Sequence, residues 1–208
     1  MGSPLKGTPC VPVVTTEQMT EIGGLIVMTQ PVPKAPLASV TLMVKIPGAV
    51  GVPETELTRH IAWDIGIAGV AEQLAKHLDA HLIVQRYSRL VIDCNRPPHV
   101  ASSIPRISDA TTIPGNEGLT REATEMRRAK IFDPYHRRID EIIDQRGSAG
   151  LPTVLVSLHS FTPIYAGIAR PWHIGTLYHR DTHLPPLLLK LLRAEGDPVA
   201  GDGATLRP

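Results

Sequence analysis

The sequence is poor in aromatic residues, in cysteine and in net charge, and each shortage excludes a class of function. Aromatic residues make up 4% of the chain and the formal net charge is +1, so neither base-stacking surfaces nor a basic face is indicated. The two cysteines, Cys10 and Cys94, are far apart and have neither disulfide-framework nor metal-type spacing. We therefore expect no nucleic-acid partner and a reducing, cytoplasmic location.

Long apolar runs are also missing from the sequence. No stretch approaches the roughly 18 apolar residues of a membrane-spanning helix. The amino terminus lacks the charged and then apolar layout of a signal peptide. We expect no membrane partner, and the 208 residues, 42% of them hydrophobic, suffice for one globular domain with a full core. The oligomeric state has no signature in the sequence.

The remaining pattern divides the chain into an irregular amino-terminal segment and a regular remainder. Residues 1–45 are rich in Pro, Thr and Val, and only short strands at 25–28 and 40–44 are predicted there. Beyond them, helices are predicted over residues 54–78, 120–146 and 184–193, and strands over residues 81–84, 90–92, 153–158 and 174–178. Strands that alternate with helices indicate an α/β fold with a mainly parallel sheet covered on both faces.

Polar groups follow three of the predicted strands, where ligands gather in parallel α/β folds. The first is Asn95-Arg96, which suits a carboxylate, because an arginine fork donates two parallel hydrogen bonds and asparagine adds a neutral donor. Ordinary turn residues before Pro97 are the alternative. His159 follows the second strand, and Arg180 follows the third as a candidate substrate contact, with a surface ion pair as the alternative.

His159, His60 and Asp64 are the candidate metal ligands. His159 follows a predicted strand, and metal ligands are common at the ends of strands. The alternative is that His159 is an ordinary hydrogen-bonded histidine in the core or in a turn. His60 and Asp64 are four residues apart, so a helix would put both on one face, as an ion pair or as two metal ligands. Composition and spacing leave these alternatives open.

Five separated segments together resemble the N-formylglutamate amidohydrolase family. They are Arg59–Gly66, Arg86–Pro97, Ile113–Asn116, Leu158–Pro163 and Arg170–Gly175, and they agree with the family in order and spacing. The resemblance covers about residues 46–202, so we take 46–208 as the family-like domain. It implies a three-layer αβα phosphorylase/hydrolase-like fold with a mixed, mainly parallel sheet, related to zinc carboxypeptidases and aspartoacylase.

The resemblance also implies an activity, which is zinc-dependent hydrolysis of the amide bond of a small N-acyl acidic amino acid such as N-formyl-L-glutamate. Asn95 and Arg96 match the pair that holds the substrate carboxylate, with Arg89 as a second cation. His159 matches a zinc-binding histidine, and Asp64 matches an acidic position that we carry over as a ligand. Zinc would polarise the amide carbonyl and lower the pKa of its water to about 7.

Two features of the family are missing from this sequence. The family carries a metal-binding histidine just before the segment aligned with Ile46-Pro47, whereas residues 40–45 contain no histidine. His60 is the nearest substitute. The glutamate motif expected after Gly201-Asp202-Gly203 is also absent, which leaves Glu117 as a candidate general base.

We therefore expect a sheet without its first-motif strand region and its carboxyl-terminal strand, in a chain truncated or frame-shifted at its ends. Impaired hydrolysis is one expected consequence. The alternative is a catalytically inactive homologue that binds small carboxylates without metal.

Overall fold

A computed structural model describes residues 25–28, 50–165, 167–178, 181, 183–195 and 200–202 of the chain. The chain divides into two compact units, Met1–Ser160 and Phe161–Pro208. The strand predicted at 40–44 lies outside the described residues, as does Arg180.

The first unit combines a three-stranded sheet and a two-stranded sheet with helices. Its elements are β1 (Leu25–Met28), α2 (Glu54–Leu57), α3 (Ile67–Leu78), β2 (His81–Val84), η2 (Ala101–Ser103), β3 (Ile107–Ser108), β4 (Thr111–Thr112), η3 (Pro114–Asn116), α4 (Arg121–Arg127), the π-helical η4 (Arg128–Phe132), α5 (Asp133–Ser148) and β5 (Leu155–Leu158). The segments α4, η4 and α5 follow one another without a break, which confirms the predicted long helix. It begins where Thr120 Oγ1 accepts a hydrogen bond from the Ala123 amide, 3.2 Å away.

The three-stranded sheet of the first unit has the strand order β2-β1-β5, and β1 runs antiparallel to both neighbours, while β3 and β4 pair separately. The mixed α/β class is as predicted, but these described pairings are antiparallel instead of mainly parallel. The reason is that β1, from the amino-terminal segment, lies between β2 and β5. These two strands still point the same way, so their carboxyl ends lie at one edge of the sheet.

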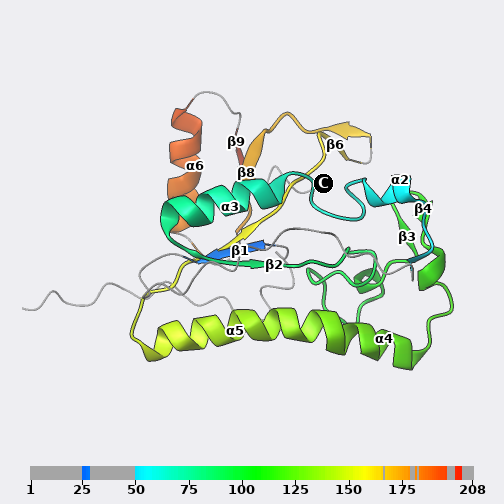
Figure 1. The fold of residues 1–208 in the computed structure, drawn as a ribbon. Coiled ribbons are helices and arrows are strands. Elements are labelled where there is room, and N and C mark those ends of the chain that lie inside the picture. The colour runs from blue at the N-terminus through cyan, green and yellow to red at the C-terminus, as the bar shows by residue number, and fades with distance from the viewer. Residues whose placement is uncertain are drawn as a thin grey trace, which may run out of the picture. The chain divides into compact units, whose positions relative to one another are not determined.

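Apolar side chains pack on both faces of this sheet. Figure 1 shows α3 on one side of β1 and β2 and the helix α4–α5 on the other. Leu82 and Val84 pack with Ala71, Ala75 and Ala80 beneath α3. Ile83 points the other way, because side chains alternate along a strand, into the larger core that includes Ile139 and Ile142 of α5.

Residues 90–92 are buried in and directly after a turn, so the strand predicted there is wrong. The Leu90 and Val91 carbonyls accept hydrogen bonds from Asn116 Nδ2 at 2.8 Å and from Arg127 Nη1 at 2.9 Å. Side chains thus satisfy backbone groups that a strand would pair with its neighbours. The run has the apolar composition of a strand because its side chains are buried, and buried residues are apolar in a turn as well as in a strand.

The helix predicted over 54–78 is also interrupted, since α2 ends at Leu57 and α3 begins at Ile67. Gly66 precedes α3 with φ 79°, a left-handed conformation that glycine adopts without steric cost. His60 and Asp64 lie in the intervening turns, so they do not share a helical face.

The second unit contains β6 (Ile164–Tyr165), β7 (Ile168–Ala169), β8 (Ile174–Thr176), α6 (Leu184–Ala194) and β9 (Ala200–Asp202). The strands β6 and β7 pair antiparallel, and β8 pairs parallel with β9. The predicted elements near 174 and 184 are confirmed. Among the described residues, no helix is long and apolar enough to cross a membrane.

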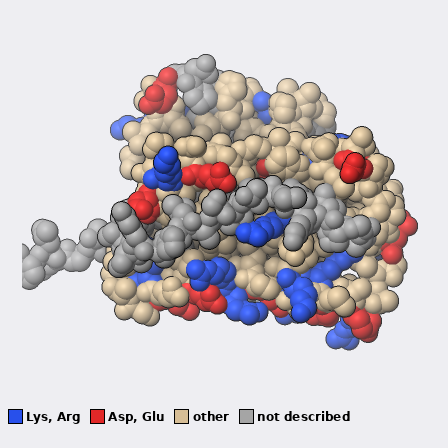
Figure 2. All heavy atoms as spheres, in the orientation of Figure 1, with Lys and Arg blue, Asp and Glu red and all other residues tan. Residues whose placement is uncertain are grey.

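Charged side chains of both signs alternate along the outer face of the helix α4–α5. Arg128 pairs with Glu125 and Asp133, and Arg138 pairs with Glu141. Figure 2 shows blue and red side chains interspersed on the face drawn. Such alternation of charge is typical of a solvated helix face.

Candidate functional site

A pocket opens in the first unit at the carboxyl ends of β2 and β5. Its polar lining comprises Asp64, Gln85, Arg86, Tyr87, Arg89, Asp93, Asn95 and His159, and its apolar lining includes Ala62, Trp63, Ile67, Val84 and Leu158. Gln85 directly follows β2, and His159 directly follows β5. The common direction of these two strands therefore brings together side chains that are far apart in the sequence.

Asp64 and His159 form the closest polar pair in this pocket. The Asp64 Oδ2 atom lies 2.5 Å from His159 Nδ1, and the two side chains are 18% and 29% exposed. Two residues that the family resemblance assigned to metal binding thus meet in the fold, although 95 positions separate them.

Arg89 extends this pair into a line of four charged or polar groups. Its Nη2 donates to Asp93 Oδ2 at 2.9 Å, and its Nη1 lies 3.5 Å from Asp64 Oδ1. Burial acts to lower the pKa of Arg89, but Asp93 and Asp64 outweigh it, so the pKa is raised. Arg89 is therefore a cation whose charge is balanced within the protein.

The carboxylate-binding pair expected from the sequence lies on a loop, residues 93–96, that Asp93 organises. Asp93 Oδ1 accepts the Asn95 amide at 2.9 Å, and the Asp93 carbonyl accepts the Arg96 amide at 3.1 Å. The Asp93 amide in turn donates to the Ser103 carbonyl at 2.7 Å. Asn95 is half-buried in the pocket lining, whereas Arg96 is exposed and is not among the lining residues.

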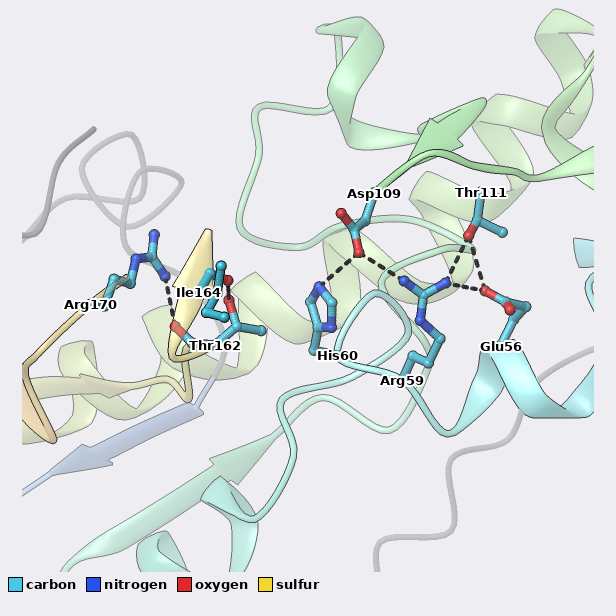
Figure 3. Close-up of polar contacts among 8 residues, drawn as sticks. All are labelled: Glu56, Arg59, His60, Asp109, Thr111, Thr162, Ile164 and Arg170. Carbon is cyan, nitrogen blue, oxygen red and sulfur yellow. Dashed lines mark hydrogen bonds and ion pairs between the residues drawn. The ribbon is translucent and has the colours of Figure 1, made fainter. Parts of the chain in front are cut away.

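His60 lies away from the pocket, beside a polar cluster that joins α2 to the β3–β4 turn (Figure 3). Its Nε2 is 3.6 Å from Asp109 Oδ2, which also accepts from Arg59 Nη2 at 2.8 Å. Arg59 Nη1 donates to Thr111 at 2.9 Å and to Glu56 at 2.5 Å. The structure thus brings Asp64 to His159 but does not bring His60 with them.

Glu117 does not line the pocket either, since it is exposed at the end of η3. Sequence reasoning assigned no role to Asp93 or Gln85, both of which line the pocket. Asp93 carries a signal that could have identified it, because aspartate commonly accepts the amide of the second residue after it. Gln85 Nε2 lies 3.1 Å from Cys94 Sγ, a contact that only the tertiary structure creates.

The described residues do not form a complete catalytic zinc site. Asp64 and His159 offer an oxygen and a nitrogen donor of the kinds that zinc takes, but a catalytic zinc ion typically has three protein ligands. Within the part of the chain that the structure describes, no group of three or more His, Cys, Asp or Glu could hold a metal. The donor set fits zinc in kind and falls short in number.

An α/β unit with a pocket and an acid–histidine pair at the carboxyl ends of its strands has the arrangement that is typical of ligand sites in α/β proteins. Residues 40–204 match the N-formylglutamate amidohydrolase family. The chain therefore belongs to the N-formylglutamate amidohydrolase family, as its motifs indicated.

Among solved structures, the chain is similar to the crystal structure of gene product Atu2144 from Agrobacterium tumefaciens. The two are 36% identical, with a TM-score of 0.68, over 74% of this chain and 63% of the other. The chain thus spans less than two thirds of that protein's length. No curated protein matches the sequence.

Proposed function

We propose that the pocket binds an N-acyl acidic amino acid such as N-formyl-L-glutamate, and that the protein hydrolyses its amide bond. The observation that carries this proposal is that Asn95 and the Asp64–His159 pair line the same pocket. Membership of the family supports the reaction type. The family's full three-layer αβα fold is part of the same proposal.

The charges of the pocket support a role for Arg96 in holding the substrate carboxylate. Asp64 and Asp93 carry two negative charges, and Arg89, which pairs with both, supplies one positive charge. An anionic ligand therefore needs further cations. Arg86 lines the pocket, and Arg96, the exposed neighbour of Asn95, has no ion pair with any described residue. Arg180 is proposed as a further substrate contact.

Zinc is the proposed cofactor, with Asp64 and His159 as its described ligands. His60 could contribute only after leaving Asp109. Because the described donors are too few, we expect weak metal affinity and impaired turnover. We assign no general base, and Glu117 would have to move from its exposed position to act as one.

A second candidate function is metal-free binding of small carboxylates by an inactive homologue. The contact between Asp64 and His159 favours it, because each of these two side chains already has the other as a hydrogen-bond partner. Such a protein would be stabilised thermally by N-formyl-L-glutamate without hydrolysing it.

Metal analysis and formate release from N-formyl-L-glutamate separate the two candidates. Hydrolysis that rises on zinc addition, in protein that retains zinc, supports the first. Zinc-insensitive hydrolysis would contradict the zinc mechanism, and binding without hydrolysis or retained zinc would support the second.

Arg96→Ala tests carboxylate binding under either candidate. We expect affinity for N-formyl-L-glutamate, measured by calorimetry, to fall about five- to tenfold. A hydrogen bond to a charged group contributes about 1.5–3 kcal/mol, and exposure reduces that value. The control, Arg137→Ala, removes an equal charge from the exposed face of α5 and should leave affinity unchanged. Equal effects of both variants would contradict a specific role for Arg96.

A further inference from the structure

His136 of α5 contacts the backbone of the loop 93–96 from the core side. Its Nε2 lies 3.0 Å from the Cys94 carbonyl oxygen. Cys94 is 5% exposed and sits between Asp93 and Asn95, two residues of the pocket lining. Because this loop belongs to no sheet, its buried carbonyl depends on a side-chain donor.

The surroundings of His136 determine which of its nitrogens carries the proton. The ring is 5% exposed and lies between Phe132, at 4.2 Å between centroids, and Tyr135, at 5.2 Å. Burial lowers the pKa of His136, which keeps the ring neutral at physiological pH. Since a carbonyl can only accept, Nε2 carries the hydrogen. Nδ1 is buried and has no hydrogen-bond partner within the described part of the chain.

We propose that His136 is a positioning residue for ligand binding, which holds Asn95 and Asp93 in place through the Cys94 carbonyl. The two neighbours of Cys94 have separate tasks, since Asp93 pairs with Arg89 and Asn95 lines the pocket. A shift of the Cys94 peptide would move both side chains together. The ligand part of this inference rests on the proposed function.

Two substitutions at His136 separate hydrogen bonding from packing. His136→Phe keeps a ring between Phe132 and Tyr135 but leaves the Cys94 carbonyl without its donor. His136→Gln loses the ring but retains an amide nitrogen at the reach of Nε2. The matched control is Ile139→Val, which trims a fully buried side chain one turn further along α5 and leaves the His136 ring in place.

The first measurement is the dissociation constant for N-formyl-L-glutamate. We expect His136→Phe to raise it about tenfold, because an unpaired buried carbonyl disfavours the ordered loop. His136→Gln should stay within about threefold of the unsubstituted protein, and Ile139→Val should lower thermal stability without changing affinity. Unchanged affinity in a folded His136→Phe protein would overturn the proposal, as would equal losses in the Phe and Gln variants.

The second measurement needs no ligand and uses the thiol of Cys94. In a Cys10→Ser background, Cys94 is the remaining cysteine, and a thiol reagent reports how often the loop opens. His136→Phe should raise its labelling rate about tenfold, with little change in His136→Gln. If the unsubstituted protein bound no N-formyl-L-glutamate, the proposed function would fail, and this rate would still decide whether His136 positions the loop. Equal labelling in all variants would refute that role.

Discussion

The pairing of Arg89 with Asp93 leads to a prediction about the stability of the first unit. The side chain of Arg89 is 36% exposed and that of Asp93 is 10% exposed. In the surface pair, the side chains of Arg138 and Glu141 are 54% and 48% exposed. Exposed pairs contribute about 0.2–1 kcal/mol, and removing one partner of a fully buried pair costs about 3–5 kcal/mol. The partial burial of Asp93 places its coupling with Arg89 between these values, at about 2 kcal/mol.

A double-mutant cycle with Arg89→Met and Asp93→Asn measures this coupling. Asn at position 93 keeps an oxygen that can accept the Asn95 amide, so the cycle isolates the charge pair. The control cycle, Arg138→Met with Glu141→Gln, should give about 0.3 kcal/mol, the usual value for such a helical pair.

Urea unfolding followed by tryptophan fluorescence is the suitable assay, because the two compact units need not unfold together. The chain has two tryptophans, Trp63 in the first unit and Trp172 in the second. A Trp172→Phe background makes Trp63, which lines the pocket, the reporter. A coupling for Arg89 and Asp93 no larger than that of the surface pair would refute the argument from burial.

Three further predictions concern groups around the loop 93–96. Arg127→Met should lower the free energy of unfolding of the first unit by about 2–4 kcal/mol in urea, because the Val91 and Gly115 carbonyls lose a charged donor. A change below about 0.5 kcal/mol would contradict this. Burial lowers the pKa of His136, so its contribution to the free energy of unfolding is complete above about pH 6.5 and decreases as the pH falls. In His136→Gln, the free energy of unfolding should therefore depend less on pH between about pH 7 and 5. An unchanged pH dependence would argue against this. Burial raises the pKa of Cys94 to about 12, which leaves little thiolate at about pH 8. In Cys10→Ser protein, a thiol reagent at about pH 8 should therefore react with the folded protein at least about a hundredfold more slowly than with the unfolded protein. Equal rates would exclude this.

Local pattern was sufficient to predict the long helices and the strands β1, β2, β5 and β8, whereas the short strands β3, β4, β6, β7 and β9 were not predicted. The strands at 25–28 and 81–84, the long helix α4–α5 and helix α6 follow from periodicity and end signals that neighbouring residues carry. The run 90–92 could not be predicted in this way. Its backbone groups bond to Asn116 and Arg127, which are remote in the sequence, and an apolar run that is buried as a turn has the composition of a strand.

The sequence by itself determined the family and the candidate residues Asp64, Asn95 and His159, because motif order and spacing are properties of the chain alone. Only the tertiary structure decided how the side chains pair. The common direction of β2 and β5 brought His159 to Asp64, while the break before Gly66 left His60 beside Asp109. Which charges meet depends on the approach of distant segments, which the local pattern of a sequence does not encode.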